Sequence, residues 1–263
     1  MSKNKTDLEL IDHKKEAVNE VDDFLNSLIS SESPIDKSKA DKLSYWLEDY
    51  IRFLKIESEI SPAKFKRYKR GQVIKVHLGF NVGSEEGGLH YALVISNNDS
   101  IKSPVVHIVP LTSIKDSTDL SSIRADRGQI VLGNELYRLL FLKVRTLETQ
   151  IDDEINDLEK EVTTLTKDDP KKDQFQNRII LLKRQSILHA KMVKEINKMK
   201  KGSIALVGQI TTVIKIRIFD PKTNKDVLSN IRMSNETMNK IDGAIERMFT
   251  YQPKSDNKIC EKS

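Results

Sequence analysis

The chain has 263 residues, 38% hydrophobic and 32% charged, and its 44 basic and 39 acidic residues give a net charge of +5. Its single cysteine, Cys260, excludes an internal disulfide or a cysteine-based metal cluster. No apolar run approaches the ~20 residues that a transmembrane helix needs, and the polar residues 1–7 do not resemble the apolar centre of a signal peptide. These features predict a cytoplasmic protein rather than a disulfide-stapled or membrane-spanning one.

Apolar residues at three- and four-residue spacings predict a helix over 6–30, and Pro34 can begin the next one. This second helix is predicted over 37–57 and carries one apolar stripe, formed by Leu43, Trp46, Leu47, Tyr50, Ile51 and Leu54. We interpret residues 1–62 as an N-terminal helical lobe. Its stripe is expected to pack either against the rest of the chain or against a partner.

The segment 64–70, Lys-Phe-Lys-Arg-Tyr-Lys-Arg, interleaves five cations with two aromatic rings. Cations can contact phosphates and rings can stack on unpaired bases. Lys66 and Arg67 are therefore candidate contacts to a nucleic-acid backbone. The alternative is a solvated basic linker in which Phe65 and Tyr68 pack on the domain beneath.

Three short apolar runs, at 73–78, 91–96 and 105–111, are rich in Val, Ile and Leu and predict strands of a compact β-structure. Between the first two lies 81–88, with three glycines and two glutamates in eight residues. Glycine opens backbone conformations that other residues resist, so this stretch predicts a long, adaptable hairpin loop. The loop is either a mobile surface hairpin or a functional loop on a rigid scaffold.

A fourth short strand is predicted at 129–132, and after it the spacing of apolar residues changes. A seven-residue spacing then predicts a heptad-like seam on a long charged helix, formed by Val144, Ile151, Leu158 and Leu165. A turn at Pro170 and a second apolar stripe follow, so residues 134–201 predict an inserted antiparallel coiled-coil hairpin. We call this hairpin the arm; it is either a helical hairpin that satisfies itself, which we favour, or a spacer, a dimerisation device or a docking surface.

The β-pattern returns with a strand predicted at 204–207 and an alternation over 214–218, apolar on one face and basic on the other. Ser234 can cap a last helix that ends near Phe249, and 251–263 predict a disordered polar tail. Residues 71–132 and 203–250 together have the size of one small domain.

Several motifs occur in a fixed order along these elements, and any one of them alone would be weak. They are Arg70-Gly71, the loop motifs Gly83-Ser84-Glu85 and Gly87-Gly88, the strand Ala92-Leu93-Val94-Ile95-Ser96-Asn97, the strand end Pro110-Leu111-Thr112-Ser113, the segment 203–210 and the helix from Ser234 to Phe249. Together they resemble the MazF/PemK family, the endoribonuclease toxins of bacterial type II toxin–antitoxin pairs.

The resemblance implies an α+β fold in which residues 71–132 and 203–250 form a discontinuous, SH3-like β-barrel with a C-terminal helix. It implies a homodimer that cleaves single-stranded RNA without a metal or other cofactor and that is restrained by a cognate antitoxin. DNA would be reached only through an antitoxin complex. The resemblance is silent about the helical lobe and the arm.

The chemistry that the resemblance implies is attack of a ribose 2′-hydroxyl on the neighbouring phosphate, which needs a base, an acid and donors to the phosphorane. The family has a threonine or serine at the end of the third strand, and Thr112, beside Ser113, matches it. The family also has an arginine after the loop glycines, where this chain has His90, and often a second arginine where it has Thr211.

Two interpretations of His90 follow, because histidine exchanges protons near neutral pH more readily than arginine does. In the first, His90 is the catalytic acid or base and Thr112 the phosphate anchor. In the second, the barrel is degenerate and holds nucleic acid or an antitoxin without cutting. A third possibility is an interaction protein whose arm and lobe recruit partners. Further candidate substrate contacts are Ser84, Glu85, Ser113, Gln209 and Lys75.

Overall fold

The computed structural model describes residues 5–57, 59, 65–163 and 172–251, and the chain divides into two compact units. Unit 1 comprises Met1–Glu59 and Gly79–Gly88, and unit 2 comprises Ile60–Leu78 and Leu89–Ser263. The predicted tail beyond residue 251, the seam residue Leu165 and the turn at Pro170 lie outside the described residues. In the ranges that are described, no helix combines the length and the hydrophobicity needed to cross a membrane.

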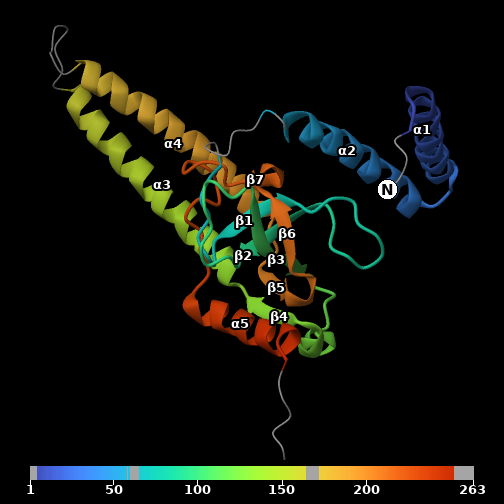
Figure 1. The fold of residues 1–263 in the computed structure, drawn as a ribbon. Coiled ribbons are helices and arrows are strands. Elements are labelled where there is room, and N and C mark those ends of the chain that lie inside the picture. Colours follow the sequence, from blue (N-terminus) through green and yellow to red (C-terminus); the bar gives the residue numbers. More distant parts are fainter. Residues whose placement is uncertain (1–4, 58, 60–64, 164–171, 252–263) are drawn as a thin grey trace, which may run out of the picture. The chain divides into compact units, whose positions relative to one another are not determined.

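Unit 1 contains the two predicted N-terminal helices, α1 (Asp7–Ser30) and α2 (Pro34–Glu57) (Figure 1). Thr6 and Glu9 form a capping box at the start of α1, with the Thr6 hydroxyl accepting from the Glu9 N–H. Only Leu28 of α1 and Ala40 of α2 are buried. In the apolar stripe of α2, Leu43, Trp46 and Leu47 are half-buried, whereas Tyr50, Ile51 and Leu54 are exposed.

The glycine-rich loop over 79–88 belongs to unit 1 and is closed by its own backbone. The Gly88 N–H donates to the Gly79 carbonyl at 2.6 Å, and the Asn81 amide donates to the Glu86 carbonyl at 2.6 Å. Gly88 has a φ of +78°, which residues with a side chain rarely adopt. The sequence therefore specifies a closed loop of defined shape.

Unit 2 is built on an antiparallel sheet of seven strands in the order β4-β5-β3-β2-β1-β7, with β6 also paired to β3. Its strands are β1 (Val73–His77), β2 (Leu89–Val94), β3 (Val105–Ile114), β4 (Gln129–Gly133), β5 (Gly202–Leu206), β6 (Thr211–Ile214) and β7 (Ile218–Asp220). The predicted α+β class is confirmed. Within the described part of the chain the hydrogen-bonded order ends at β4 and β7, so closure into the predicted barrel is not confirmed.

Alternation along the strands gives the sheet two apolar faces. On one face Val73, Leu93 and Leu111 pack with residues of three helices, α3 (Glu135–Val162), α4 (Lys172–Lys198) and α5 (Asn235–Phe249). On the other face Ile74 and Ala92 pack with residues from β6 and β7. We call these the helix-covered face and the inner face.

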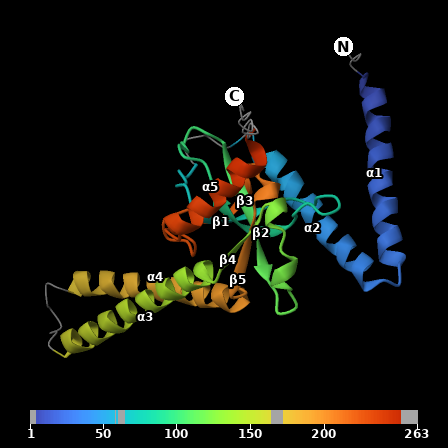
Figure 2. The same cartoon turned by 90° about the horizontal axis from the view of Figure 1, so that it is seen from below.

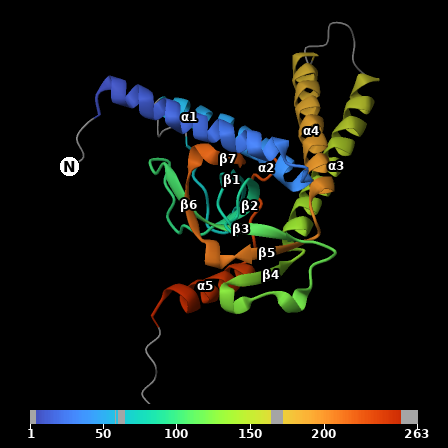
Figure 3. The same cartoon turned by 90° about the vertical axis from the view of Figure 1, so that its right-hand side faces the viewer.

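Two helices, α3 and α4, cover most of the predicted arm and run side by side away from the sheet (Figures 2 and 3). Its coiled-coil packing and its status as an insertion stay predictions. Val144, Ile151 and Leu158 of the predicted seam are buried. Arg178 of α4 donates to Glu154 and Glu161 of α3 at 2.7 and 2.6 Å. The base of the arm also enters the main core, through Leu136, Leu140, Val144, Met192 and Ile196.

The alternation over 214–218 is not one strand, contrary to the prediction. β6 ends at Ile214, a 3-10 turn covers Lys215–Arg217, and β7 begins at Ile218. The physical reason is that β6 pairs with β3 whereas β7 pairs with β1, so the chain must cross between them. The turn also directs Lys215 inward, where its ammonium lies 2.8 Å from Asp99 and both side chains are 1% exposed.

Candidate active site

Two of the predicted site residues lie on neighbouring strands. β2 and β3 are antiparallel with Tyr91 opposite Leu111, so the same register, continued by one residue, brings His90 opposite Thr112. Residues opposite each other in an antiparallel pair face the same side, and alternation puts both on the inner face at its edge. Both side chains are half-buried, which leaves part of each accessible from solvent.

The neighbouring strand orients the His90 ring. Its Nδ1 lies 3.3 Å from the Leu111 carbonyl oxygen. A carbonyl only accepts hydrogen bonds, so this contact places the proton of the neutral ring on Nδ1. Nε2 is then the basic nitrogen of the ring, which is the arrangement that a proton-transferring histidine needs.

Thr112 and Ser113 follow each other at the end of β3. Thr112 pairs with Ile204 of β5, and Ser113 pairs with Ser203 and is exposed. Among the described residues, neither hydroxyl has a hydrogen-bond partner. Each can therefore donate to an incoming phosphate oxygen without breaking an internal bond.

Lys75, predicted as a phosphate contact, is not brought to this place. It lies opposite Tyr91 and so on the helix-covered face, where its ammonium pairs with Glu195 of α4 and lies 5.3 Å from the Tyr91 ring centre. The Tyr91 hydroxyl also donates to Glu195. Burial is the main cause that raises the Tyr91 pKa above its ordinary value, and this hydrogen bond is the second. Burial opposes ionisation of Glu195, but the bonds from Lys75 and Tyr91 keep its pKa below the ordinary value.

The other predicted contacts belong to other elements of the chain. Ser84 and Glu85 are exposed in the loop of unit 1, and Gln209 is half-buried in a 3-10 turn, Val207–Gln209. Thr211, where the family often has arginine, is exposed at the start of β6.

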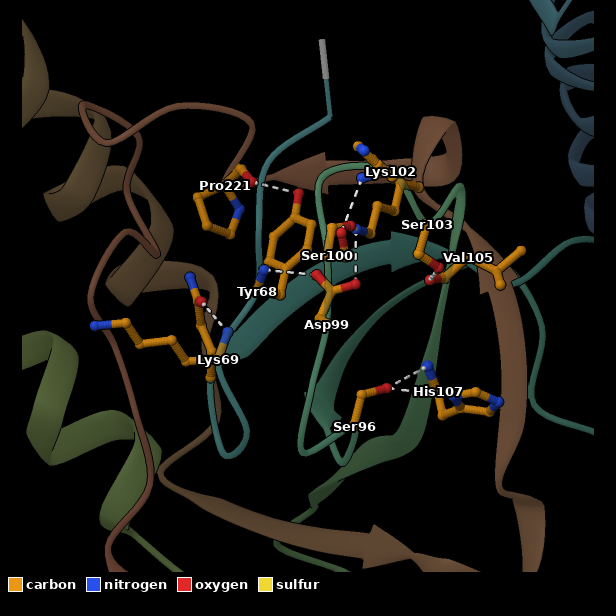
Figure 4. Close-up of polar contacts among 12 residues, drawn as sticks. Tyr68, Lys69, Ser96, Asp99, Ser100, Lys102, Ser103, Val105, His107 and Pro221 are labelled. Carbon is orange, nitrogen blue, oxygen red and sulfur yellow. Dashed lines mark hydrogen bonds and ion pairs between the residues drawn. The ribbon is translucent and has the colours of Figure 1, made fainter. Parts of the chain in front are cut away.

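In the basic segment, Tyr68 packs on the domain instead of offering its ring to a base. It is 3% exposed, its N–H donates to Asp99 at 2.7 Å and its hydroxyl donates to the Pro221 carbonyl at 2.8 Å (Figure 4). The Lys66 ammonium donates to the Asn224 side chain at 2.6 Å, whereas Arg67 is exposed. Tyr68 thus packs on the domain, as in the alternative that treats this segment as a linker. Arg67 remains a candidate phosphate contact.

The motif Arg70-Gly71 has a structural explanation. The Arg70 guanidinium donates to the Ile95 carbonyl and to Asp242 of α5. Gly71 has a φ of +76°, and a Cβ there would lie 3.3 Å from Met238 of α5. The motif therefore anchors the start of β1 beneath the C-terminal helix.

Sequence reasoning did not single out Arg217 as a site residue. Its Nε donates to the His77 carbonyl at 2.7 Å, and His77 lies opposite Leu89, the residue before His90. Burial lowers the Arg217 pKa, yet a guanidinium keeps its charge in proteins. The only sequence signal was the basic alternation over 214–218, which does not indicate which strand end the cation reaches.

An α+β domain with a glycine-rich loop between its first two strands and a Thr-Ser pair ending the third has the architecture predicted for a type II toxin. The comparison with protein families agrees: residues 69–171 match the PemK-like, MazF-like toxin of type II toxin-antitoxin system. Residues 69–171 are therefore similar to the MazF/PemK toxin family, as the motifs predict, and the match spans less than half of the chain. A search of curated proteins finds no match.

The matched region extends from just before β1 through α3. It includes the loop, His90, Thr112 and Ser113, and it ends before α4. The predicted resemblance of 203–210 and of the C-terminal helix lies outside it and stays a prediction.

Proposed function

We propose that this chain is the toxin of a type II toxin–antitoxin system and that it cleaves single-stranded RNA. The observation that carries the proposal is the placement of His90 and Thr112 on adjacent strands of the inner face, with the Leu111 carbonyl orienting the His90 ring. The family match supports the toxin class, and the side chains of this strand end support the reaction.

In the proposed reaction the ribose 2′-oxygen forms a bond to phosphorus while the bond from phosphorus to the 5′-oxygen breaks. The products are a cyclic 2′,3′-phosphate and a 5′-hydroxyl. The 2′-hydroxyl loses a proton and the 5′-oxygen gains one, and His90 Nε2 carries out one of these two transfers. Thr112 donates to a non-bridging phosphate oxygen, and Ser113 assists at the same strand end.

The negative charge that develops on the phosphorane needs a cation or donors. The family arginines are missing at His90 and Thr211. We assign this role to Arg217, because its guanidinium is bonded to β1 beside the strand end that carries His90. The reaction so written uses no metal and no cofactor.

Partners and location follow from the family in the same proposal. A cognate antitoxin would restrain the chain, two copies would associate through their sheets, and the complex would act in the cytoplasm. The alternative is a domain that binds RNA or an antitoxin without cutting. It is favoured by the two missing family arginines.

The test is incubation of the purified full-length chain with a mixed-sequence RNA pool in EDTA, followed by analysis of the product ends. We expect fragments with a 5′-hydroxyl, which polynucleotide kinase labels without prior phosphatase treatment. A requirement for added Mg²⁺, or 5′-phosphate ends, would contradict the reaction. Binding of the pool without cleavage would establish the non-cutting alternative.

A further inference from the structure

A cleft of about 560 Å³ lies in unit 2 between α4 and the connection that follows β7. Figure 1 shows the base of α4 beside this connection. Five lysines line the cleft: Lys191, Lys194 and Lys198 of α4, and Lys222 and Lys225 of the connection. All five are exposed, and in the part of the chain that is described none of their ammonium groups has a hydrogen-bond or ion-pair partner.

The carboxylates of the cleft are occupied by the protein itself. Glu195 accepts from Lys75 and Tyr91. Asp220 accepts from the N–H groups of Leu228 and Val227, and Asp226 accepts from those of Lys222 and Thr223. The acidic groups keep their charge while they fix the walls, so the cleft attracts an anion through its surplus of cations, five lysines against three carboxylates.

The wall opposite α4 is anchored from a second helix. Lys143 of α3 donates to the carbonyls of Val227 and Ser229 at 2.8 and 2.7 Å. The Lys143 ammonium is partly buried, and this burial is the main reason that its pKa lies below the ordinary value. Lys66 holds the same connection through Asn224. A ligand would therefore meet a surface that is already formed.

The lysines of α4 recur at three and four residues and so form one row along the helix. The row from Lys191 to Lys198 is about 10 Å long at 1.5 Å per residue. Phe219 of β7 lines the cleft beside them and is 63% exposed. A row of cations with an exposed ring is the combination that binds single-stranded nucleic acid, through phosphate contacts and base stacking.

We propose that this lysine cleft binds the backbone of single-stranded RNA and that Phe219 stacks on an unpaired base. The choice of RNA rests on the proposed function. The cleft is distinct from the candidate active site, because Glu195 pairs with Lys75 on the helix-covered face whereas His90 and Thr112 lie on the inner face. The exposed ring favours RNA over an acidic protein segment, which would use the lysines alone.

The first test measures binding of the full-length chain to a labelled, mixed-sequence single strand that carries 2′-O-methyl groups at every ribose and so cannot be cleaved. The variant Lys191→Ala/Lys194→Ala/Lys225→Ala should bind about tenfold or more weakly. Its plot of log affinity against log salt should lose about 2 units of slope, since each phosphate contact contributes about 0.7. Equal affinity and slope would overturn the proposal.

A matched control removes the same charge elsewhere. Lys14, Lys37 and Lys55 are exposed on the helices of unit 1, and the triple alanine variant at these positions should bind like the unaltered chain. An equal loss of affinity in both triple variants would show that binding depends only on net charge. That result would also overturn the proposal of a specific binding cleft.

The second test addresses the ring. Phe219→Ala should weaken single-strand binding by about 5- to 100-fold, the range of one base–aromatic stack. A duplex of the same length should be unaffected, because its bases are already stacked. If poly-L-glutamate binds more tightly than the RNA strand and the cleft variant abolishes that binding, the partner is an acidic protein and the RNA assignment is wrong.

These outcomes are separable from failure of the proposed function. The probe cannot be cut, so a wild-type chain that lacks nuclease activity can still confirm the cleft. Conversely, if the chain cleaves RNA and the cleft variants bind normally, the proposed function stands and the inference about the cleft is wrong.

Discussion

At the scale of single residues, the replacement of arginine by His90 changes what the site can do. An arginine supplies a fixed charge, whereas a histidine can accept and release a proton. The Leu111 carbonyl fixes the ring so that Nε2 is the basic nitrogen. The loss of charge is then offset only if another cation, for which Arg217 is the candidate, reaches the phosphate.

This division of roles predicts how variants at the site behave. His90→Ala should lower RNA cleavage by about 10²- to 10⁴-fold, because a proton transfer is lost, while binding of an uncleavable strand changes little. His90→Arg restores the family residue and should keep part of the activity with a changed pH profile. Single-turnover cleavage across pH, set beside binding of the 2′-O-methyl strand, separates the two effects.

Thr112→Ala is the companion change and should slow cleavage through a weaker hold on the phosphate, while Thr112→Ser retains the hydroxyl and most of the rate. Cleavage by His90→Ala at the unaltered rate would remove this residue from the mechanism. Loss of activity in Thr112→Ser as in Thr112→Ala would indicate a packing role for this side chain.

The sequence predicts the pairing of His90 with Thr112 only through the family resemblance, and it does not predict the contacts of Lys75. Strand alternation shows that Lys75 and His90 face opposite sides. It cannot show that a helix distant in the sequence covers the Lys75 side and supplies Glu195. The predicted basic face over 214–218 does not reveal the burial of Lys215 for the same reason, since its buried partner Asp99 lies on a different connection.

At the scale of elements, patterns that depend on local physics were predicted well. The apolar spacing gave both N-terminal helices, and the heptad seam gave α3 with Val144, Ile151 and Leu158 buried. The Ser234 hydroxyl accepts from the Thr237 N–H, as its predicted role as a helix cap requires. The 3-10 turn between β6 and β7 was missed, because the same alternation fits a continuous strand.

The arm is partly structural. Its base contributes Leu140 and Met192, each with 0% exposure, to the core of the helix-covered face. Beyond Ile151, the described α3 and α4 residues pack mainly on each other through the seam and Arg178. We therefore propose that the arm has a core base and a separable tip.

Two deletions test this proposal. Replacing residues 152–182 by a short glycine-rich loop should leave the sheet with cooperative thermal unfolding and a nearly unchanged midpoint. Replacing 134–201 should abolish cooperative unfolding, because losing even one buried leucine costs about 2–5 kcal/mol. Circular dichroism during heating measures both. Equal midpoints for the two deletions would show that the whole arm is dispensable, and non-cooperative melting of the shorter deletion would show that the tip is part of the fold.

At the scale of the whole molecule, the two units differ in how they are stabilised. Both hydrophobic cores of unit 2 are made from residues of unit 2 alone. The helices of unit 1 bury only Leu28 and Ala40 and expose many apolar side chains, among them Val18 at 58%. Burial of apolar surface is the main favourable contribution to folding, so unit 1 has much less stabilisation of its own.

The chain offers a separate optical probe for each unit. Trp46, the only tryptophan, lies on α2 in unit 1. Tyr68 and Tyr91 are largely enclosed in unit 2, where Tyr68 is 3% exposed. Tryptophan fluorescence therefore follows unit 1. Tyr45 and Tyr50 also lie on α2 but are exposed, so the near-ultraviolet circular dichroism of the enclosed tyrosines follows unit 2.

We predict that heating the full-length chain alters Trp46 fluorescence at a lower temperature than it removes the tyrosine signal. The reason is that local stability follows buried apolar contacts, so a unit with few of them opens first. A chain lacking residues 1–57 should retain the upper transition at nearly the same temperature, since neither core loses a residue. Coincident transitions in the full chain, together with a lowered midpoint after the deletion, would show that unit 1 is energetically part of unit 2 and would contradict independent stability.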